Sequence, residues 1–225
     1  MLDLGIGTGR TTYTFAPLAG EYEGIDYVPE MIELARGLVS ENEHIRLQVG
    51  DARRLTELFE RSFDLILFSF NGIDAAGHEE RLEMLHQVRS RLSDGGLFCF
   101  SAHSAHCLPL EKPGLTLDVG HPLRSAYRSA RAMQLRKRVK RVNAGVDVPG
   151  LHARGWGLVA DGSHGFEERW YYVTAEEQVR QLEEAGFAPI EVLRNDGIAI
   201  DPSAPGRDPW LHYLCGPGNA YRQLG

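Results

Sequence analysis

The sequence predicts an α/β protein built on a doubly wound, mostly parallel sheet. Over residues 1–103, short apolar segments that fit buried strands alternate with segments of helical periodicity. The stretch LDLGIGTGR, residues 2–10, has the pattern of a strand that turns through glycines into a helix. Two further apolar segments, 189–194 and 210–215, fit strands near the end of the chain.

The glycine turn is the strongest local signal. An acid, Asp3, lies between two leucines, and three glycines follow at alternate positions: Gly5, Gly7 and Gly9. Glycine is required where the backbone takes positive φ or where a ligand approaches too closely for a Cβ. The turn leads into a helix over 10–19, whose first N–H groups can bind a ligand. The dinucleotide fingerprint G-x-G-x-x-G would need a glycine at Arg10, so the spacing departs from it by one residue.

Composition limits the classes of function. At 225 residues, 43% of them hydrophobic, the chain suits one domain with an insertion, and a net charge of −7 disfavours a general nucleic-acid binder. The three cysteines form no C-x-x-C pair, which favours a reducing cytoplasm. The sequence contains no run of about 18 apolar residues, so we predict no membrane span. His103, His106 and Cys107 do not match a zinc-ligand set, so we predict no metal.

The second strand, 22–28, ends near Asp26, which lies 21 positions after Gly5. This is close to the roughly 20 residues expected before a carboxylate that binds the hydroxyls of a ribose. The acid supports a nucleoside ligand without choosing an enzyme class. A helix over 29–39 then begins at a proline, and we expect one of its faces to be apolar through Met31, Leu34 and Leu38.

Later strand ends supply further candidate residues. The third strand begins at residue 45 and ends at Gly50-Asp51; Asp51 is either a ligand contact or the cap of a short helix over 52–60. The fourth strand breaks at Asn71, and after a helix over 78–92 the fifth strand ends at His103. In open α/β sheets ligands bind beyond the carboxyl ends of the strands. We therefore expect these residues to face the reaction zone: Phe70, Asn71, Ile73, Asp74 and His103.

The pattern D-x-G-x-G-x-G at residues 3–9, with the acids that follow it, resembles the first motif of class I S-adenosylmethionine-dependent methyltransferases. The segments FSFNGID and GGLFCFSAH resemble a bacterial subset of that family, and the resemblance covers 1–103 and 170–216. It implies a Rossmann-like methyltransferase sheet that is mostly parallel and ends in a C-terminal antiparallel hairpin, formed by 189–194 and 210–215. It also implies S-adenosylmethionine as the cofactor. Family members usually carry one or two helices before the first strand, so we expect the chain to be short at its N-terminus.

The resemblance also implies roles for individual residues. It places Asp3 at the methionine ammonium, the three glycines against the cofactor, Asp26 at the ribose and Asp51 at the adenine amino group. It places the backbone of Ala52 at an adenine ring nitrogen and Phe70 beside the cofactor.

Methyl transfer from a sulfonium is an in-line displacement, so the protein mainly aligns the reactants and excludes water. A base is needed only where the nucleophile carries a tightly held proton. His103 is the first candidate base, although it could instead bond the backbone of the neighbouring insertion; Asn71 and Asp74 are weaker catalytic candidates. We expect a small-molecule acceptor. The alternatives are an NAD-dependent oxidoreductase and a degenerate binding module without efficient turnover.

Residues 104–168 do not continue the strand–helix alternation, and we predict a lid-like insertion into a core of 1–103 and 169–225. Eight basic residues and no acid lie in 124–141, which predicts either a solvated helix or a contact with an acidic partner such as an acidic substrate or RNA. After the insertion, Thr174 and Glu177 predict a capping box, and Gly186 predicts the end of that helix.

Overall fold

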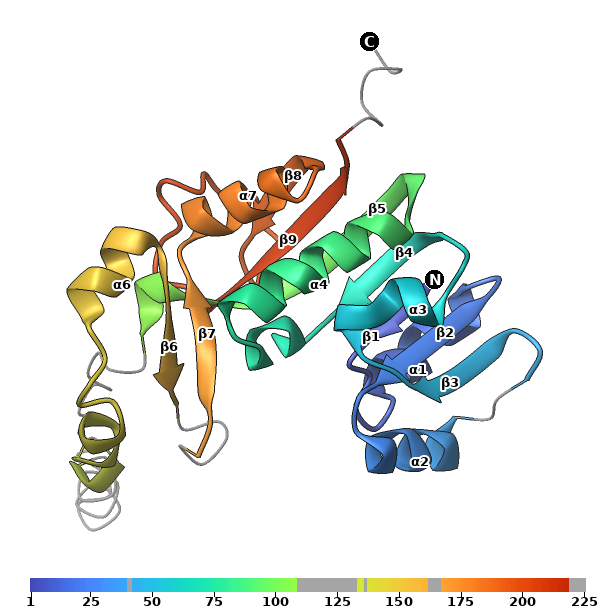
Figure 1. Cartoon of the computed structure of the whole chain (residues 1–225), viewed down its shortest axis with the longest axis horizontal. Helices are drawn as coiled ribbons and strands as arrows, with labels where there is room; N and C mark the ends of the chain where they lie inside the picture. The colour runs from blue at the N-terminus through green and yellow to red at the C-terminus, as the bar shows by residue number, and fades with distance from the viewer. Residues whose placement is uncertain (40–41, 109–132, 136, 162–166, 219–225) are drawn as a thin grey trace, which may run out of the picture.

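A computed structural model describes residues 1–39, 42–108, 133–135, 137–161 and 167–218. The first five strands of its sheet are parallel and lie in the spatial order β3-β2-β1-β4-β5 (Figure 1). Their bounds are Leu2–Leu4 for β1, Tyr22–Asp26 for β2, Ile45–Val49 for β3, Phe63–Phe68 for β4 and Leu92–Ser104 for β5. Neighbouring strands in this set pair in parallel. The predicted mostly parallel sheet is confirmed.

The chain returns to this sheet through β8 (Phe187–Leu193) and β9 (Trp210–Pro217). β9 runs antiparallel to β5 and to β8, so the predicted closing hairpin is confirmed. The apolar side chains of β9 that alternate inward, Leu211, Tyr213 and Cys215, are buried in the main core. This alternation fixes the register of the hairpin, because a shift by one residue would expose all three.

β7 (Arg169–Val173) lies at the carboxyl edge of the sheet. Along one edge of β5, β9 pairs from Phe98 to His103. On the other edge β4 pairs as far as Phe100, and β7 pairs only with His103 and Ser104. At His103 one edge of β5 is occupied by β9. β7 therefore pairs with the opposite edge of β5, the one along which β4 pairs up to Phe100. β7 therefore continues directly beyond the end of β4, above the turn that follows it.

β6 (Trp156–Ala160) pairs antiparallel with β7 and completes the sheet at this edge. It belongs to the predicted insertion 104–168, so the last part of that segment adds a strand to the sheet. Residues 133–135 and 137–142 are helical, followed by α6 (Val148–Arg154). Most of the basic run 124–141 lies outside the described residues, and the division into core and insertion stays a prediction.

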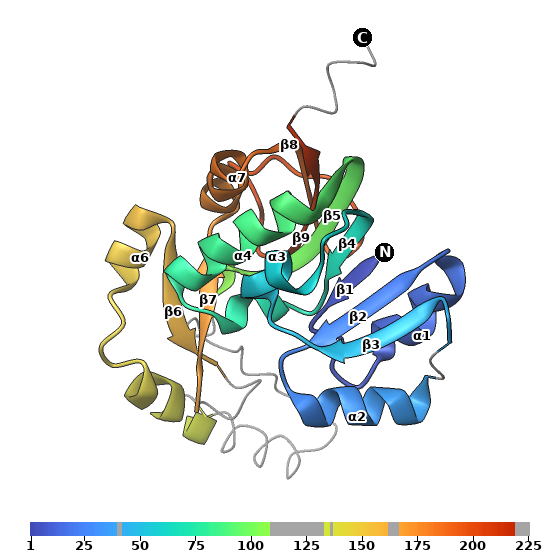
Figure 2. The same cartoon turned by 45° about the vertical axis from the view of Figure 1, so that its right-hand side comes forward.

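The helices cover both faces of the sheet, which makes the fold doubly wound (Figures 1 and 2). On one face α4 and α7 pack over the main core; on the other, α1 and α2 enclose a smaller core. The helix bounds are Arg10–Phe15 for α1, Pro29–Leu38 for α2, Leu55–Leu58 for α3, His78–Arg91 for α4 and Ala175–Glu184 for α7. Within the described ranges, no helix is both long enough and apolar enough to cross a bilayer.

Short 3₁₀ turns extend several of these helices. The segment predicted as one helix over 10–19 is α1 followed by η1 (Ala16–Leu18), and the segment 52–60 is η2 (Ala52–Arg54) followed by α3. Two more turns follow strand ends: η3 (Gly72–Ala75) after β4, and η4 (Ala105–Cys107) after β5. η3 brings the chain from the end of β4 back toward β5 and β7.

Two local predictions need correction. The buried face of α2 carries Ile32 and Ala35, whereas Leu34 and Leu38 are 55% and 71% exposed. α2 turns the face that carries the small Ala35 inward because it packs against the glycine turn, where a Cβ on Gly9 would lie 3.3 Å from that of Ala35. The capping box of α7 is also incomplete. Thr174 accepts the hydrogen bond from the Glu177 amide, but the Glu177 side chain pairs with Arg180.

The corrected face of α2 gives a matched prediction. Replacing Ile32 by alanine removes a fully buried side chain and should lower the free energy of unfolding by about 2–4 kcal/mol. Leu38→Ala in the same helix should change it by less than about 0.5 kcal/mol, because Leu38 is exposed. Urea unfolding of both variants measures the two values. Equal losses would contradict this packing of α2.

Candidate active site

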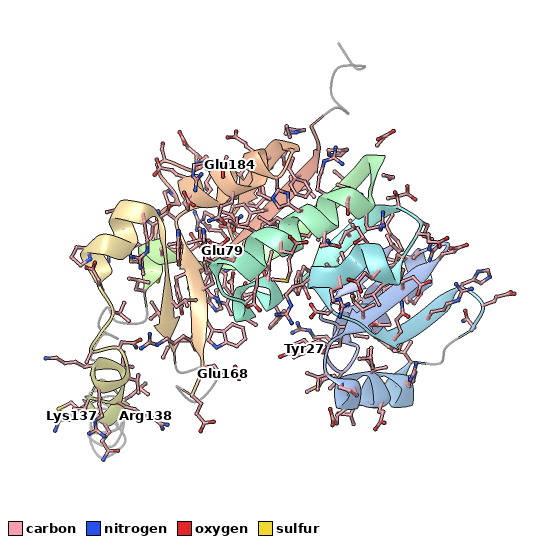
Figure 3. The ribbon with its side chains drawn as sticks, in the orientation of Figure 1. Tyr27, Glu79, Lys137, Arg138, Glu168 and Glu184 are labelled. Carbon is pink, nitrogen blue, oxygen red and sulfur yellow. The ribbon has the colours of Figure 1, made fainter. Side chains whose placement is uncertain are left out.

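A cavity of about 340 Å³ opens at the carboxyl edge of the sheet, within the size range of small-molecule sites. Its wall includes three residues that the sequence analysis assigned to the cofactor, namely Gly5 from the glycine turn, Asp26 from the end of β2 and Ala52 from η2. Tyr27, labelled in Figure 3, lines it from the loop after β2, and Trp170 lines it from β7. Three consecutive strand ends and the added β7 therefore meet around one cavity.

The glycine turn needs its glycines for the predicted reason. Gly5, Gly7 and Gly9 have φ angles of 64°, 54° and 89°, in the left-handed region that side chains disfavour. A Cβ on Gly5 would also lie 3.0 Å from the ring of Phe68. The turn is tied to the neighbouring strand, since the amide of Gly7 donates to Asp26 Oδ2 at 2.8 Å.

Asp26 is held rigidly at the rim of the cavity. Its Oδ1 accepts a hydrogen bond from the amide of Val28 at 3.0 Å, and Oδ2 accepts the one from Gly7. Each carboxylate oxygen can accept two hydrogen bonds, so both keep capacity for a ligand hydroxyl. The arrangement orients the carboxylate before any ligand arrives.

Asp3 is fully buried beneath the same turn. Its Oδ2 accepts a hydrogen bond from the hydroxyl of Tyr22 at 2.6 Å, while its Oδ1 has no hydrogen-bond partner among the described residues. Burial raises the pKa of Asp3 to about 6, although hydroxyls of Thr11 and Tyr22 act in the opposite direction. A buried carboxylate with one unsatisfied oxygen is stabilised by a cationic group placed beside it.

Asp51 and Phe70 lie outside the lining of this cavity. The Asp51 side chain caps η2 by accepting from the amide of Arg53 at 2.9 Å, and the Arg53 guanidinium holds its pKa below the ordinary value. Asp51 therefore acts as the cap of η2, and its contact with adenine stays a prediction. Phe70 is 58% exposed and lines a second cavity of about 400 Å³, where its ring faces Trp210 at 5.6 Å and the Arg10 guanidinium at 3.2 Å.

The three predicted catalytic candidates, Asn71, Asp74 and His103, come together in one buried cluster. Asp74 Oδ2 accepts from the amide of His103 at 2.6 Å and lies 2.8 Å from its Nδ1. Because a carboxylate can only accept, Nδ1 carries a proton, and whenever the ring is neutral the lone pair lies on Nε2. Nε2 lies 3.2 Å from Asn71 Nδ2. The cluster holds the imidazole in the tautomer that a general base needs.

Arg81 completes this cluster and was not predicted from the sequence. It is fully buried on α4, where its guanidinium forms an ion pair with Asp74 and donates to Gln178 of α7. A signal was present, because residue 81 lies on the same helical stripe as Leu85 and Val88, both buried. From sequence alone, however, an arginine in an apolar stripe is expected to extend into solvent. Its burial becomes understandable only once the fold shows that Asp74 lies beside it.

Asp161 and Tyr172 were also not assigned to the site in advance. Asp161 follows β6, and its Oδ2 accepts from the Tyr172 hydroxyl at 2.9 Å and lies 3.9 Å from His103 Nε2. The ring of Tyr172 is 4.9 Å from that of His103, and those of Trp170 and Trp210 are 6.0 and 6.2 Å away. His103 thus lies between two carboxylates and among three aromatic rings.

Comparison with known proteins gives a family for the N-terminal part. Residues 1–96 match the family model described as a methyltransferase domain. The chain is 32% identical over 124 residues to the uncharacterized methyltransferase YcgJ of Bacillus subtilis, covering 54% of this chain and 46% of that protein. It is 31% identical over 118 residues to the ubiquinone/menaquinone biosynthesis C-methyltransferase UbiE of Geobacter sp., covering 50% and 48%. The chain spans about half the length of the curated relatives it matches.

Solved structures extend the likeness to almost the whole chain. An S-adenosylmethionine-dependent methyltransferase from Clostridium acetobutylicum superposes with a TM-score of 0.63 at 17% identity, covering 96% of this chain and 83% of that one. The glycopeptide N-methyltransferase MtfA complexed with S-adenosyl-L-methionine gives 0.57 at 17% identity, covering 96% and 81%. At these identities the likeness establishes the fold.

The buried Asp3 predicts a specific dependence of stability on pH. Its folded-state pKa lies above the unfolded value, so ionisation disfavours folding once the pH rises above the unfolded pKa. Asp3→Asn removes that cost and should stabilise the protein at pH 7.5 by about 1–3 kcal/mol, with about half of the gain left at pH 5. Chemical denaturation at both pH values measures the gain.

The control for this prediction is Asp64→Asn, the same change at an exposed carboxylate. It should shift the free energy of unfolding by less than about 0.5 kcal/mol at either pH. A loss of stability in Asp3→Asn at pH 7.5 would mean that the Asp3 carboxylate is satisfied within the folded chain.

Proposed function

Because residues 1–96 match a methyltransferase family model and the fold is that of S-adenosylmethionine-dependent methyltransferases, we propose that the chain transfers the methyl group of S-adenosylmethionine to a small-molecule acceptor. The observation that carries this proposal is the cavity at the carboxyl edge of the sheet, with Asp26 at its rim and the unsatisfied Asp3 carboxylate beneath the glycine turn. S-adenosylmethionine is the cofactor of this family, and structural neighbours are crystallised with it or with S-adenosylhomocysteine.

The residues around the cavity fit this cofactor. The unpaired Oδ1 of Asp3 would accept from the ammonium of the methionine part, and Asp26 would accept from the ribose hydroxyls. Asp51 and the backbone of Ala52 would contact the adenine, and Phe70 would lie beside the cofactor, as the family resemblance implies. Ala52 lines the cavity, whereas the Asp51 carboxylate would have to release Arg53.

S-adenosylmethionine supplies a methyl group on a positively charged sulfur, so the protein needs to align the acceptor and, where the acceptor holds a proton tightly, to remove it. His103 is the general base of the proposal. Asp74 holds it through Nδ1, and Arg81 balances the charge of Asp74, so Nε2 can take a proton from the acceptor. Asn71 lies against Nε2 and would orient the acceptor.

The nature of the acceptor is proposed on broader grounds. The named relatives include a C-methyltransferase and an N-methyltransferase, so their names do not choose the atom. A net charge of −7 disfavours nucleic acid, and the free cysteines suit a cytoplasmic location. An acidic acceptor or partner remains part of the proposal through the basic segment, on which Figure 3 labels Lys137 and Arg138. The family match does not support the alternatives of an NAD-dependent oxidoreductase or a degenerate module.

Calorimetric titration with S-adenosylhomocysteine, with NAD in parallel, tests the cofactor assignment. We expect the first to bind and the second not. Asp26→Ala should weaken binding about 10- to 100-fold, because it removes hydrogen bonds between a carboxylate and the ribose. Binding of NAD alone, or of neither ligand, would contradict the proposal. The exposed Asp64→Asn should bind like the wild type.

The role of His103 predicts a separation of binding from turnover. His103→Ala should bind S-adenosylhomocysteine within about twofold of wild type, because His103 does not line the cofactor cavity. Transfer of labelled methyl groups to a small-molecule extract should fall about 10²- to 10⁴-fold, the usual contribution of a general base. His86→Ala, on the exposed side of α4, is the matched control. Undiminished transfer in His103→Ala would exclude this role.

A further inference from the structure

We infer that the second cavity, of about 400 Å³, is the acceptor site, and that it takes an aromatic carboxylate whose anionic end is bound by Arg10. The inference rests on the proposed methyl transfer and goes further by naming the class of acceptor and the place where it binds. Its basis is threefold: the position of the cavity beside His103, the charge of the cavity wall, and the way in which Arg10 is held there.

The cavity lies on the same face of the sheet as the proposed base. Cys99 and Ser101 of β5 line it, and they alternate along the strand with residues of the main core. His103 is the next residue of β5 on that face. In the pairing of β5 with β9, Ser101 is opposite His212 and His103 is opposite Trp210, and both of these β9 residues line the cavity. The wall of the cavity therefore ends directly beside His103.

The charge of the wall selects an anion. Of the described residues that line the cavity, none is acidic and only Arg10 carries a permanent charge. Burial lowers the pKa of His212 and raises that of the Cys99 thiol, so both side chains are uncharged at pH 7.5. The chain as a whole is the opposite, with 31 acidic residues against 24 lysines and arginines. An anion that enters this cavity meets one cation and no like charge.

Arg10 is held in a way that suits a carboxylate. Its guanidinium carbon lies 3.2 Å above the centre of the Phe70 ring. At this distance the guanidinium must lie flat on the ring, because an edge-on approach would push its nitrogens into the ring. Among the described residues, Arg10 forms no ion pair and its side chain donates no hydrogen bond. The flat contact leaves the N–H groups at the guanidinium edge, where they can bind a carboxylate in a bidentate manner.

The backbone of Phe70 gives an independent sign of a binding site. Its φ of 57° lies in the left-handed region, which is an outlier for a bulky residue, and its side chain stays 58% exposed. Strained residues of this kind cluster at ligand-binding positions. The conformation places the Phe70 ring between the Arg10 guanidinium and the ring of Trp210, which is 5.6 Å away. Phe70 thus fixes Arg10 and walls the cavity with the same ring.

The rest of the wall selects the body of the ligand. Leu67 of β4 and Cys99 of β5 line the cavity from the sheet, and the rings of Phe70 and Trp210 are inclined at 65° to each other. A ligand ring can present its face to one of them and its edge to the other, which is the favoured geometry of aromatic contacts. A carboxylate without a ring would leave most of the cavity unfilled.

The contacts also give the direction in which the ligand extends. From the Arg10 guanidinium they run through the rings of Phe70 and Trp210 to that of His103, in steps of 3.2, 5.6 and 6.2 Å. A molecule of one or two rings that binds Arg10 through its carboxylate therefore approaches His103 with its other end. Ser101 connects the same two regions, because it lines the cavity and accepts a hydrogen bond from the backbone N–H of Asn71.

The carboxylate of the cofactor is a second source of the same chemistry. Arg10 directly follows the glycine turn, so the carboxylate in the methionine part of S-adenosylmethionine can come close to it. The two sources differ in their consequence. If Arg10 binds the cofactor, a second anion is excluded once the cofactor is present, whereas an acceptor carboxylate binds together with the cofactor.

Benzoate, the smallest aromatic carboxylate, is the probe that tests this site. We would titrate it at pH 7.5 and constant ionic strength, with and without saturating S-adenosylhomocysteine, and follow the indole N–H resonances of the three tryptophans. Trp210→Phe identifies the resonance of Trp210. A ligand of this size should bind with a dissociation constant of about 1 mM. We expect a saturable shift of Trp210 in both titrations.

Two related probes separate the charge of benzoate from its ring. Benzamide keeps the ring and the shape but carries no charge, and acetate keeps the charge without the ring. Each should bind about tenfold more weakly than benzoate, or not measurably. Equal binding of benzamide and benzoate would contradict the role of Arg10, and equal binding of acetate would contradict the aromatic part of the assignment.

Substitutions at the cavity test the place of binding. Arg10→Ala should weaken benzoate binding about tenfold or more, and Arg10→Lys about threefold, because lysine keeps the charge but not the bidentate edge. Cys99→Leu fills the cavity from the sheet and should abolish the shift. Arg54→Ala, at an exposed arginine paired with Glu57, is the matched control and should bind like wild type. Near-ultraviolet circular dichroism and S-adenosylhomocysteine affinity report whether each variant is folded.

The outcomes separate this inference from the proposed function. If S-adenosylhomocysteine binds but benzoate does not shift Trp210, or binds Arg10→Ala like wild type, the acceptor site is wrong and the methyltransferase proposal stands. If S-adenosylhomocysteine displaces benzoate and itself binds Arg10→Ala more weakly, Arg10 serves the cofactor and the inference is also overturned. Failure to bind S-adenosylhomocysteine, with a saturable benzoate shift that depends on Arg10, would count against the cofactor assignment alone.

Discussion

The ion pair between Asp74 and Arg81 is the interaction on which the architecture of the site depends. Both side chains are fully buried, and the second arm of Arg81 reaches Gln178 on α7, so the pair links η3, α4 and α7. Removing one partner of such a pair commonly costs about 3–5 kcal/mol, because the other is left as an uncompensated buried charge. Asp74 also holds the backbone and the ring of His103. The geometry of the base is therefore tied to the packing of the two core helices.

The position of β7 explains how the two halves of the site meet. Since β7 pairs with β5 only beyond the end of β4, its residues lie over the η3 turn. The alternation of side chains along β7 then directs Trp170 to the cofactor cavity and Tyr172 to Asp161, while Tyr171 between them stacks on the Arg81 guanidinium. One short strand thus contributes to the cofactor cavity, the cluster around His103 and the ion pair.

The features that the sequence predicted well are local ones. Asp3, the three glycines and Asp26 belong to a strand–turn–helix–strand unit whose spacing is set by backbone geometry, so their positions follow from short-range patterns. Arg81 and Asp161 join the site through contacts with Asp74 and His103, which lie 7 and 58 positions away in the sequence. The fold brings these residues together through η3 and β7, and no local sequence pattern specifies such contacts. The face of α2 was mispredicted for a related reason. Periodicity offered two apolar stripes, and only the close approach to Gly9 selects the one with Ala35.

The turn after β4 connects the cofactor loop to the acceptor loop through a single side chain. The same edge of the Phe68 ring packs so closely against Gly5 and Gly72 that a Cβ at either position would crowd its Cε2 atom. In the turn between Phe68 and Gly72, Phe70 and Asn71 both have φ angles near 57°, a conformation that costs about 1 kcal/mol or more for each non-glycine residue. The Ser101 hydroxyl holds this conformation by accepting a hydrogen bond from the backbone N–H of Asn71 at 2.9 Å. The strained turn determines where the side-chain amide of Asn71 points. A movement of the glycine turn on cofactor binding would therefore be passed through Phe68 to Asn71, which would couple the cofactor site to the acceptor site.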